Sequence, residues 1–292
     1  MVSGLKGKRM KFGINLFATD FGIHPVELGQ TLETLGFESL FFAEHTHIPV
    51  NRRSPHPYAA DINQDYLRCL DPFVALATVA ASTNHLRIGT GICLVVERDP
   101  ITLAKAVATL DHLSGGRFLF GVGGGWNLEE MENHGTDPQR RWKVLRERIE
   151  AMKTIWMQDE PAYHGEFISF GPIWQWPKPV QKPHPPILIG GDGANTLKRV
   201  VRYGDGWMPV AAYDPNDLTA FKQRVANLNQ LAADAGRDPI PVTVMGMPPK
   251  LDVLKRYEQI GVERILFWLD SASKDEIIPI LEQYADLIQY FV

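Results

Sequence analysis

Residues 25–47 read PVELGQTLETLGFESLFFAEHTH, which predicts a helix, a stop and a buried strand in direct succession. Leu28 and Leu32 recur at helical spacing. Pro25 suits the first turn of the helix and Gly36 suits its end. The apolar run that follows is typical of a strand covered on both faces, and a helix followed by such a strand is the repeating unit of α/β proteins.

The same alternation of short apolar runs and longer helical patterns continues along the whole chain. Eight apolar runs are candidate strands, and each is followed by a helical pattern, which predicts a closed α/β barrel of the (β/α)8 TIM type in a single domain spanning residues 1–292. The competing fold is an open doubly wound sheet. We favour the barrel because no G-x-G-x-x-G turn follows the first strand. The eight runs are residues 12–16, 38–44, 86–92, 117–123, 186–191, 204–210, 241–246 and 264–269.

Two segments are longer than a connecting turn requires. Residues 48–71 follow the second strand and residues 159–186 precede the fifth strand. We expect both to be insertions in the barrel. The second is rich in aromatic residues and prolines, which indicates a short hairpin and a packed excursion.

The composition limits the classes of function that the chain can have. The chain has 292 residues, of which 45% are hydrophobic, and 30 basic residues against 34 acidic ones give a net charge of -4. This balance argues against a nucleic-acid-binding surface. The two cysteines, Cys69 and Cys93, are too few for a disulfide framework. Because we find neither a signal peptide nor an apolar run near the ~20 residues that span a bilayer, we expect a cytoplasmic protein that does not bind membranes.

The second predicted strand ends in Glu44, His45 and, two residues later, His47. Barrel enzymes place their chemistry at this end of the strands. The acid and the imidazole indicate a strand-end cap, a metal site or an acid/base pair facing a cofactor. A metal needs about three ligands, and the later strand ends supply no histidine and one aspartate, so no metal is expected. His47 is expected to point away and to be structural.

Glycines crowd the ends of the fourth and fifth predicted strands. GVGGGWN at residues 121–127 contains four of them, which lets a flat ligand or a backbone approach closely. GGDGAN follows the fifth strand, and a helix is expected to begin near Ala194. Because N–H groups at the start of a helix bind anions, the two loops together predict a planar cofactor with a phosphate tail. The predicted phosphate contacts are Gly193, Ala194 and Asn195, beside Gly190 and Gly191.

These residues lie in three stretches that resemble the bacterial luciferase-like oxidoreductases. The stretches are LGFESLFFAEHTHIP at 35–49, LRIGTGICLVVERDPITLAKAVATLDHLSGGRFLFGVGGGWNLEEM at 86–131 and HGEFISFGPIWQWPKPVQKPHPPILIGGDGANTLKRVVRYGDGWMPV at 164–210. The match is closest to the branch that uses the deazaflavin coenzyme F420. The resemblance implies an oxidoreductase that moves a hydride between F420 and a small organic substrate, acting as a homodimer and served by a separate cofactor-reducing enzyme.

The resemblance also implies roles for individual residues. Glu44 and His45 would lie beside the polar edge and the reactive face of the ring, with His45 as the acid/base or substrate-orienting residue. An imidazole that titrates near neutrality suits proton handling. Thr90, Gly91 and Ile92 would form the back face of the ring site, with a cis peptide bond between Gly91 and Ile92.

One position departs from the family's pattern. The sugar-phosphate dehydrogenase branch has Gly-x-Gly-x-Gly-Glu, whose Glu donates a proton, and here Trp126 stands in its place. Because an indole cannot deliver a proton, we do not expect a sugar-phosphate dehydrogenase. Gly124, Trp126 and Asn127 are expected to line the cofactor pocket.

The first insertion is either a solvated loop or part of a lid over the site. Its candidate lid residues are Arg52, Arg53, His56, Tyr58 and Tyr66. Three other functions stay open: a monooxygenase that uses reduced flavin mononucleotide (FMN) and oxygen, a metal-dependent barrel hydrolase, and a barrel that binds flavin without turnover.

Overall fold

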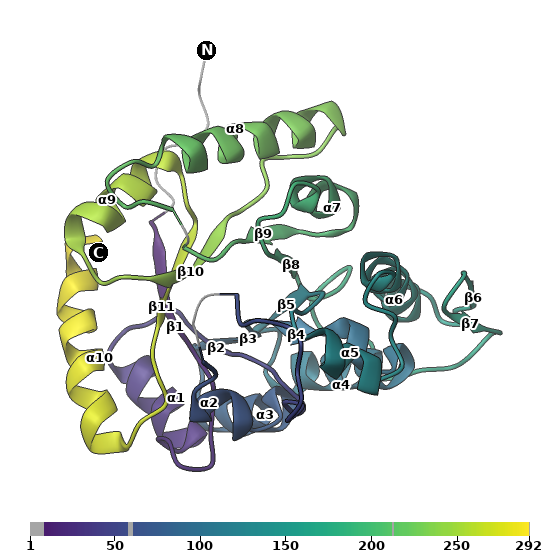
Figure 1. The fold of residues 1–292 in the computed structure, drawn as a ribbon, viewed down its shortest axis with the longest axis horizontal. Helices are drawn as coiled ribbons and strands as arrows, with labels where there is room; N and C mark the ends of the chain where they lie inside the picture. Colours follow the sequence, from purple (N-terminus) through teal and green to yellow (C-terminus); the bar gives the residue numbers. More distant parts are fainter. Residues whose placement is uncertain (1–8, 58–60, 212, 292) are drawn as a thin grey trace.

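Parallel strands form a barrel in the computed structural model, which describes residues 9–57, 61–211 and 213–291 (Figure 1). In the main sheet, neighbouring strands follow the order β10-β11-β1-β2-β3-β5-β8-β9. All eight predicted strands are present, so the predicted fold is confirmed. Their bounds are β1 Lys11–Leu16, β2 Ser39–Phe42, β3 Arg87–Thr90, β5 Phe118–Gly123, β8 Ile187–Gly190, β9 Gly206–Met208, β10 Thr243–Met247 and β11 Arg264–Trp268.

The two ends of this sheet meet and close the barrel. Parallel bridges join Trp207 to Val242 and Val210 to Met245. The backbone N–H of Met245 donates to the carbonyl of Pro209 at 2.9 Å. These contacts rule out the competing fold, an open doubly wound sheet.

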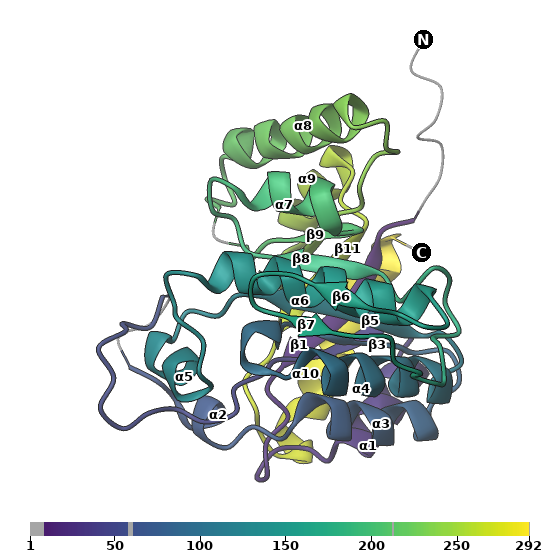
Figure 2. The same cartoon turned by 90° about the vertical axis from the view of Figure 1, so that its right-hand side faces the viewer.

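Helices surround the strands on the outside (Figures 1 and 2). Two of them begin at the sequence Asp-Pro: the side chains of Asp71 and Asp99 accept hydrogen bonds from first-turn N–H groups, and the proline fills the first helical position. The bounds are α1 Pro25–Thr34, α2 Gln64–Leu67, α3 Pro72–Ser82, α4 Pro100–Leu113, α5 Leu128–Asn133, α6 Arg141–Met157, α7 Thr196–Tyr203, α8 Thr219–Asp234, α9 Leu251–Ile260 and α10 Lys274–Ile288.

The core has two layers, as a barrel requires. The large outer layer lies between the strands and the helices and contains fully buried residues such as Ile14, Leu76 and Phe120. A smaller cluster contains one residue from each of six strands. These residues are Phe41, Leu119, Leu188, Met208, Met245 and Leu266.

Both predicted insertions interrupt the regular repeat. The first contains the short helix α2, and Figure 2 shows α2 and α5 at the same end of the barrel. The second contains the predicted hairpin, in which β6 (Tyr163–His164) pairs antiparallel with β7 (Ser169–Phe170) beyond α6 (Figure 1). A short strand that was not predicted, β4 (Cys93–Leu94), pairs with β5 and leads into the 3-10 helix η1 (Val95–Glu97).

Every helix among the residues that the structure describes is too short or too polar to span a bilayer.

Candidate active site

Glu44 at the end of β2 anchors a neighbouring segment of the chain. Its side chain is buried, and Oε2 accepts a hydrogen bond from the backbone N–H of Leu94 at 2.6 Å. Oε1 accepts from Nε of Arg98 at 2.6 Å. Glu44 therefore ties the end of β2 to β4 and to the residue after η1, and Arg98 balances its charge.

His45 is held by a carboxylate from another βα unit. Its Nδ1 atom lies 2.6 Å from Oε2 of Glu130, and both side chains are buried. The other oxygen of Glu130 accepts from the backbone N–H of Thr46 at 2.8 Å and from that of His47 at 3.4 Å. Asn127 caps α5 by accepting from the N–H of Glu130, which fixes where the carboxylate enters the site.

The charge state of Glu130 follows from these contacts. Burial raises the pKa of Glu130, but the hydrogen bond and charge of His45 and the two backbone donors outweigh burial and lower it overall. Glu130 is therefore a carboxylate at neutral pH, and Nδ1 of His45 carries the proton that it accepts. This leaves Nε2 of His45 for a ligand.

Aromatic rings surround His45. The ring centroid of Trp126 lies 5.6 Å from that of His45, and the ring of Tyr66 lies at 5.3 Å. His56 stacks edge-on against Trp126 at 5.2 Å, and its Nε2 lies 2.8 Å from the hydroxyl of Tyr66. Phe17, at the end of β1, lies 6.0 Å from His45. Two candidate lid residues, His56 and Tyr66, are thus brought to Trp126 and His45.

The remaining lid candidates differ in position. Arg53 forms ion pairs with Glu129 and Glu132 on α5, each at 2.8 Å, so it fastens the insertion to that helix. Arg52 is half-buried, and Tyr58 lies outside the described residues.

The peptide bond between Gly91 and Ile92 is cis, as predicted. Gly91 lies against Asn15 of β1, since a Cβ atom on Gly91 would lie 2.4 Å from Oδ1 of Asn15. That oxygen is buried and has no hydrogen-bond partner among the described residues. Thr90 donates its hydroxyl to the carbonyl of Gly121 at 2.7 Å, which joins the ends of β3 and β5.

The glycines near this bond leave space for neighbouring side chains of the protein. A Cβ atom on Gly123 would lie 2.2 Å from the side chain of Ile92, and one on Gly190 would lie 3.0 Å from it. A Cβ atom on Gly124 would lie 2.8 Å from the ring of Trp142. The sequence interpretation allowed a flat ligand or a close backbone, whereas the structure shows that side chains fill the space beside these three glycines.

Two guanidinium groups flank Trp142 next to Gly124. The guanidinium of Arg199, one turn into α7, lies 3.8 Å from the centre of the ring, and that of Arg141 lies at 5.1 Å. Both arginines therefore concentrate positive charge between α6 and the start of α7.

The predicted phosphate loop is exposed from Gly191 to Asn195. Helix α7 begins at Thr196, two residues later than expected, and the side chain of its N-cap, Asn195, makes no capping hydrogen bond. First-turn N–H groups lack acceptors within their own helix, so this end presents donors to an anion. Within the loop, Asp192 is paired with Arg224 at 2.5 Å, which offsets a charge that would repel a phosphate.

Sequence reasoning missed Glu130 and Glu97. Glu97, the last residue of η1, is buried beside Glu130, and no donor among residues 9–57, 61–211 and 213–291 bonds to either of its oxygens. A signal for Glu130 was present, because an acidic run follows Asn127 directly after the glycines. The sequence around Glu97 gave no such signal.

The ring of His47 is held by hydrogen bonds to Thr46 and Asn133. Its Nδ1 lies 2.9 Å from the hydroxyl of Thr46, and its Nε2 lies 2.9 Å from the side-chain amide of Asn133. These contacts link the polar tip of β2 to α5.

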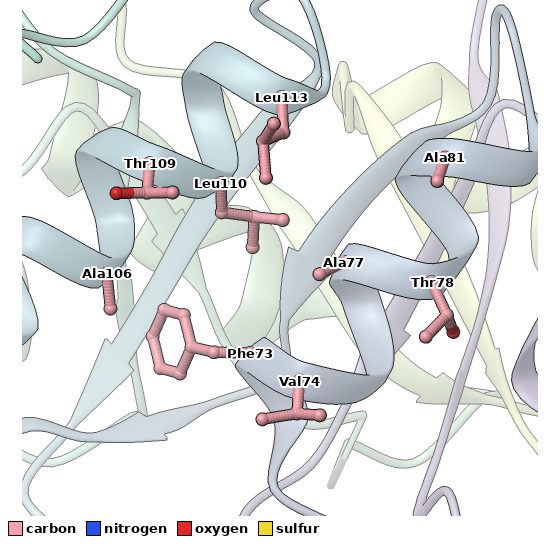
Figure 3. Close-up of a pocket in the computed structure, with 9 residues that line it drawn as sticks. All are labelled: Phe73, Val74, Ala77, Thr78, Ala81, Ala106, Thr109, Leu110 and Leu113. Carbon is pink, nitrogen blue, oxygen red and sulfur yellow. The ribbon is translucent and has the colours of Figure 1, made fainter.

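Two other observations concern different kinds of site. Across residues 9–57, 61–211 and 213–291, no group of three or more His, Cys, Asp or Glu side chains is arranged to hold a metal ion. An apolar groove of about 590 Å³ lies between α3 and α4 on the outside of the barrel (Figure 3). The residues lining this α3–α4 groove include no titratable side chain, so it does not offer acid/base chemistry.

Comparisons with known proteins agree with this architecture. The model of the luciferase-like monooxygenase family matches residues 23–249. An uncharacterized protein of Mycobacterium tuberculosis is 43% identical over 281 residues, which cover 94% of this chain and 98% of the relative. The FMNH(2)-dependent dimethylsulfone monooxygenase of Pseudomonas putida is 31% identical over 159 residues, 53% of this chain and 42% of that protein.

Two solved structures share the fold along nearly the whole chain. The monooxygenase RslO1 from Streptomyces bottropensis has a TM-score of 0.79 at 20% identity, with 97% of this chain and 98% of that chain covered. An F420-dependent secondary alcohol dehydrogenase in complex with an F420-acetone adduct has a TM-score of 0.73 at 19% identity, with the same coverage.

Proposed function

This chain belongs to the luciferase-like monooxygenase family, and from that premise we propose that it is an F420-dependent oxidoreductase acting on a small organic substrate. The observation that carries the proposal is the buried pair of His45 and Glu130 at the strand ends. A hydride transfer that changes a hydroxyl into a carbonyl, or the reverse, must also move one proton. A histidine held by a carboxylate is suited to that task.

The residues at the strand ends fit a planar ring with a phosphate tail. The orphaned oxygen of Asn15 and the orphaned amide nitrogen of Asn127 are buried polar atoms that a ligand can satisfy. Gly91 and Ile92 would lie under the ring, while Gly193, Ala194 and Asn195 would hold the phosphate. These contacts, with those of Glu44, Thr90 and Trp126, are part of the proposal.

When bound, the deazaflavin supplies hydride transfer rather than single-electron chemistry. The tasks of this chain are to orient the substrate and to manage the proton. In the oxidising direction, the proton of the substrate hydroxyl passes to Nε2 of His45 while the Nδ1 proton stays in its hydrogen bond to Glu130. In the reducing direction, Nε2 returns that proton to the carbonyl oxygen. The aromatic rings of Trp126 and Tyr66 exclude water from the imidazole.

Arg141 and Arg199 support F420 over FMN. F420 carries a long acidic tail beyond its phosphate, and two guanidinium groups near the start of α7 would attract those additional charges. The second candidate is a monooxygenase that receives reduced FMN from a separate reductase, which the similarity to the dimethylsulfone monooxygenase favours.

A binding titration with F420 and FMN, side by side, tests the proposal. We expect F420 to bind at least tenfold more tightly, a difference of about 1.4 kcal/mol. Arg199→Gln should reduce that preference, since it removes a charge near the tail. Tighter binding of FMN, with oxygen consumption in the presence of reduced FMN, would support the monooxygenase instead.

We also propose that the protein is a homodimer. In the α3–α4 groove, Val74 is 69% exposed and Leu113 is 63% exposed (Figure 3). In the second insertion, Trp174 is 80% exposed and Trp176 is 57% exposed. Large apolar side chains at the surface favour association, and a second copy would bury them.

A further inference from the structure

A second carboxyl group lies behind the one that holds His45. Glu97 is 7% exposed, and within the part of the chain that the structure describes neither of its oxygens has a hydrogen-bond donor. Its carboxyl group lies against that of Glu130. It also lies close to the glycine loop, because a Cβ atom on Gly125 would be 3.6 Å from Oε1 of Glu97. Glu97 is therefore connected to His45 through Glu130.

Two buried carboxyl groups in contact do not both carry a charge, so one of them retains a proton. The hydrogen-bond donors around each carboxyl group determine which of the two is protonated. Glu130 accepts hydrogen bonds from His45, from the backbone and hydroxyl of Thr46 and from the backbone of His47. Glu97 accepts none. Burial, together with the charges of Glu130 and Glu44, raises the pKa of Glu97 to about 9.

We infer that Glu97 is a neutral carboxylic acid whose proton is donated to Glu130, so that Glu97, Glu130 and His45 form one hydrogen-bonded chain. A hydrogen bond between two carboxyl groups accounts for both observations on Glu97. Without its proton the group accepts no hydrogen bond from the described residues, and with its proton it becomes the donor to Glu130.

The chain of three groups has a consequence for His45, which rests on the proposed role of this histidine in moving a proton. When Nε2 takes up a proton, the negative charge of Glu130 stabilises the imidazolium. A hydrogen bond from Glu97 spreads that charge over two carboxyl groups and weakens its hold on the ring. Glu97 is thus a positioning residue that helps His45 to release its proton.

Other ionisable groups face this cluster, and none of them is its partner in the chain. Arg98 is paired with Glu44 and with Asp71, which limits its effect on Glu97. Arg148 of α6 also faces Glu97, but its guanidinium donates to the carbonyl of Val95 and forms no hydrogen bond with the carboxyl group. The remaining groups near the cluster are His47, His56, His134, Cys69 and Cys93.

Carboxyl NMR of the free protein tests the inference without any cofactor. Glutamate labelled with ¹³C at the side-chain carboxyl gives one resonance per residue, and Glu97→Gln identifies the resonance of Glu97 by its loss. We expect that resonance to have the chemical shift of a protonated acid at pH 7 and to move only above neutral pH. A resonance that titrates near pH 4.5 would overturn the inference.

The effect on His45 is measured in the same protein from the titration of its ring resonances. Glu97→Leu removes the donor, so the midpoint of the titration should rise by about one pH unit. Glu97→Gln restores a donor and should return the midpoint to within a few tenths of a unit of the wild-type value. Equal midpoints in all three proteins would contradict the inference.

Glu132→Gln is the matched control, because Glu132 lies on α5 but pairs with Arg53 at the surface. Both readouts should be unchanged in this variant. These measurements test the carboxyl chain separately from the proposed function. If the NMR results hold but the protein binds no deazaflavin, the function is wrong and the carboxyl chain stands.

Discussion

Nδ1 of His45 lies 2.6 Å from Oε2 of Glu130, although 85 positions separate the two residues in the chain. One residue follows β2 and the other lies in α5, so the barrel brings the ends of two βα units together. Glu130 also accepts the N–H of Thr46, which fixes the backbone beside His45. The orientation of the imidazole therefore depends on α5 as much as on its own strand.

Glu130→Gln should lower turnover without unfolding the protein. The amide oxygen can still accept the Nδ1 proton of His45, but the negative charge that stabilises an imidazolium is lost. We expect kcat to fall by ~10-fold or more, within the range usual for groups that assist proton transfer. The pH dependence of kcat checks the mechanism, because the limb that reports the histidine should move. An unchanged profile would assign Glu130 to structure alone.

His45→Ala and His47→Ala form a pair that separates proton handling from packing. We expect His45→Ala to cut turnover by ~100-fold or more while cofactor affinity stays nearly intact. His47→Ala should affect turnover much less, because His47 bonds to Thr46 and Asn133. Loss of cofactor affinity with normal turnover of the bound complex would make His45 a binding residue instead.

The strands were predictable because burial on both faces leaves a continuous apolar run, as in residues 117–123. The pairing of His45 with Glu130 was not, because the acidic run after Asn127 marks a carboxylate but does not tell which residue, 85 positions away, it contacts. The glycines show a third case. Their number at the end of β5 indicated close approach, but only the structure shows that Ile92 and Trp142 are the groups that approach.

Stability should depend on pH through Glu97. Burial and the neighbouring carboxylates raise its pKa to about 9, from 4.5 in an unfolded chain. The folded protein therefore binds this proton more tightly, so the contribution of Glu97 to stability is full below pH 4.5 and is lost as the pH rises towards 9. Glu97→Gln removes this dependence.

The variant should thus gain stability over the wild type as the pH rises from 5 to 8, by at most about 1.4 kcal/mol per pH unit. Urea denaturation at several pH values measures the difference in the free energy of unfolding. Glu132→Gln serves as the control and should follow the wild type. A constant difference across the range would show that Glu97 ionises normally.

Association through the α3–α4 groove is tested by a charge at its rim. Leu113→Glu should shift the sedimentation coefficient from that of a dimer to that of a monomer, because burying an unpaired carboxylate is unfavourable. Tyr290→Glu is the control, since Tyr290 is a comparably exposed apolar side chain, at 69%, outside the residues that line the groove. A monomeric wild type at micromolar concentration would contradict the proposed dimer.

Gly193→Val tests the proposed phosphate contact at the start of α7. A Cβ atom on Gly193 meets only Thr196, at 3.7 Å, and its φ lies outside the left-handed region, so the substitution should leave the fold intact. The branched side chain would instead cover the first-turn N–H groups that face the phosphate. Cofactor affinity should fall by more than tenfold, or ~1.4 kcal/mol.

Gly171→Val is the matched control, because no atom of the described residues lies within 4 Å of its Cβ position and Gly171 is in the second insertion. Equal affinities of the two variants would place the phosphate elsewhere, whereas a loss confined to Gly193→Val would support the loop before α7 as the anion site.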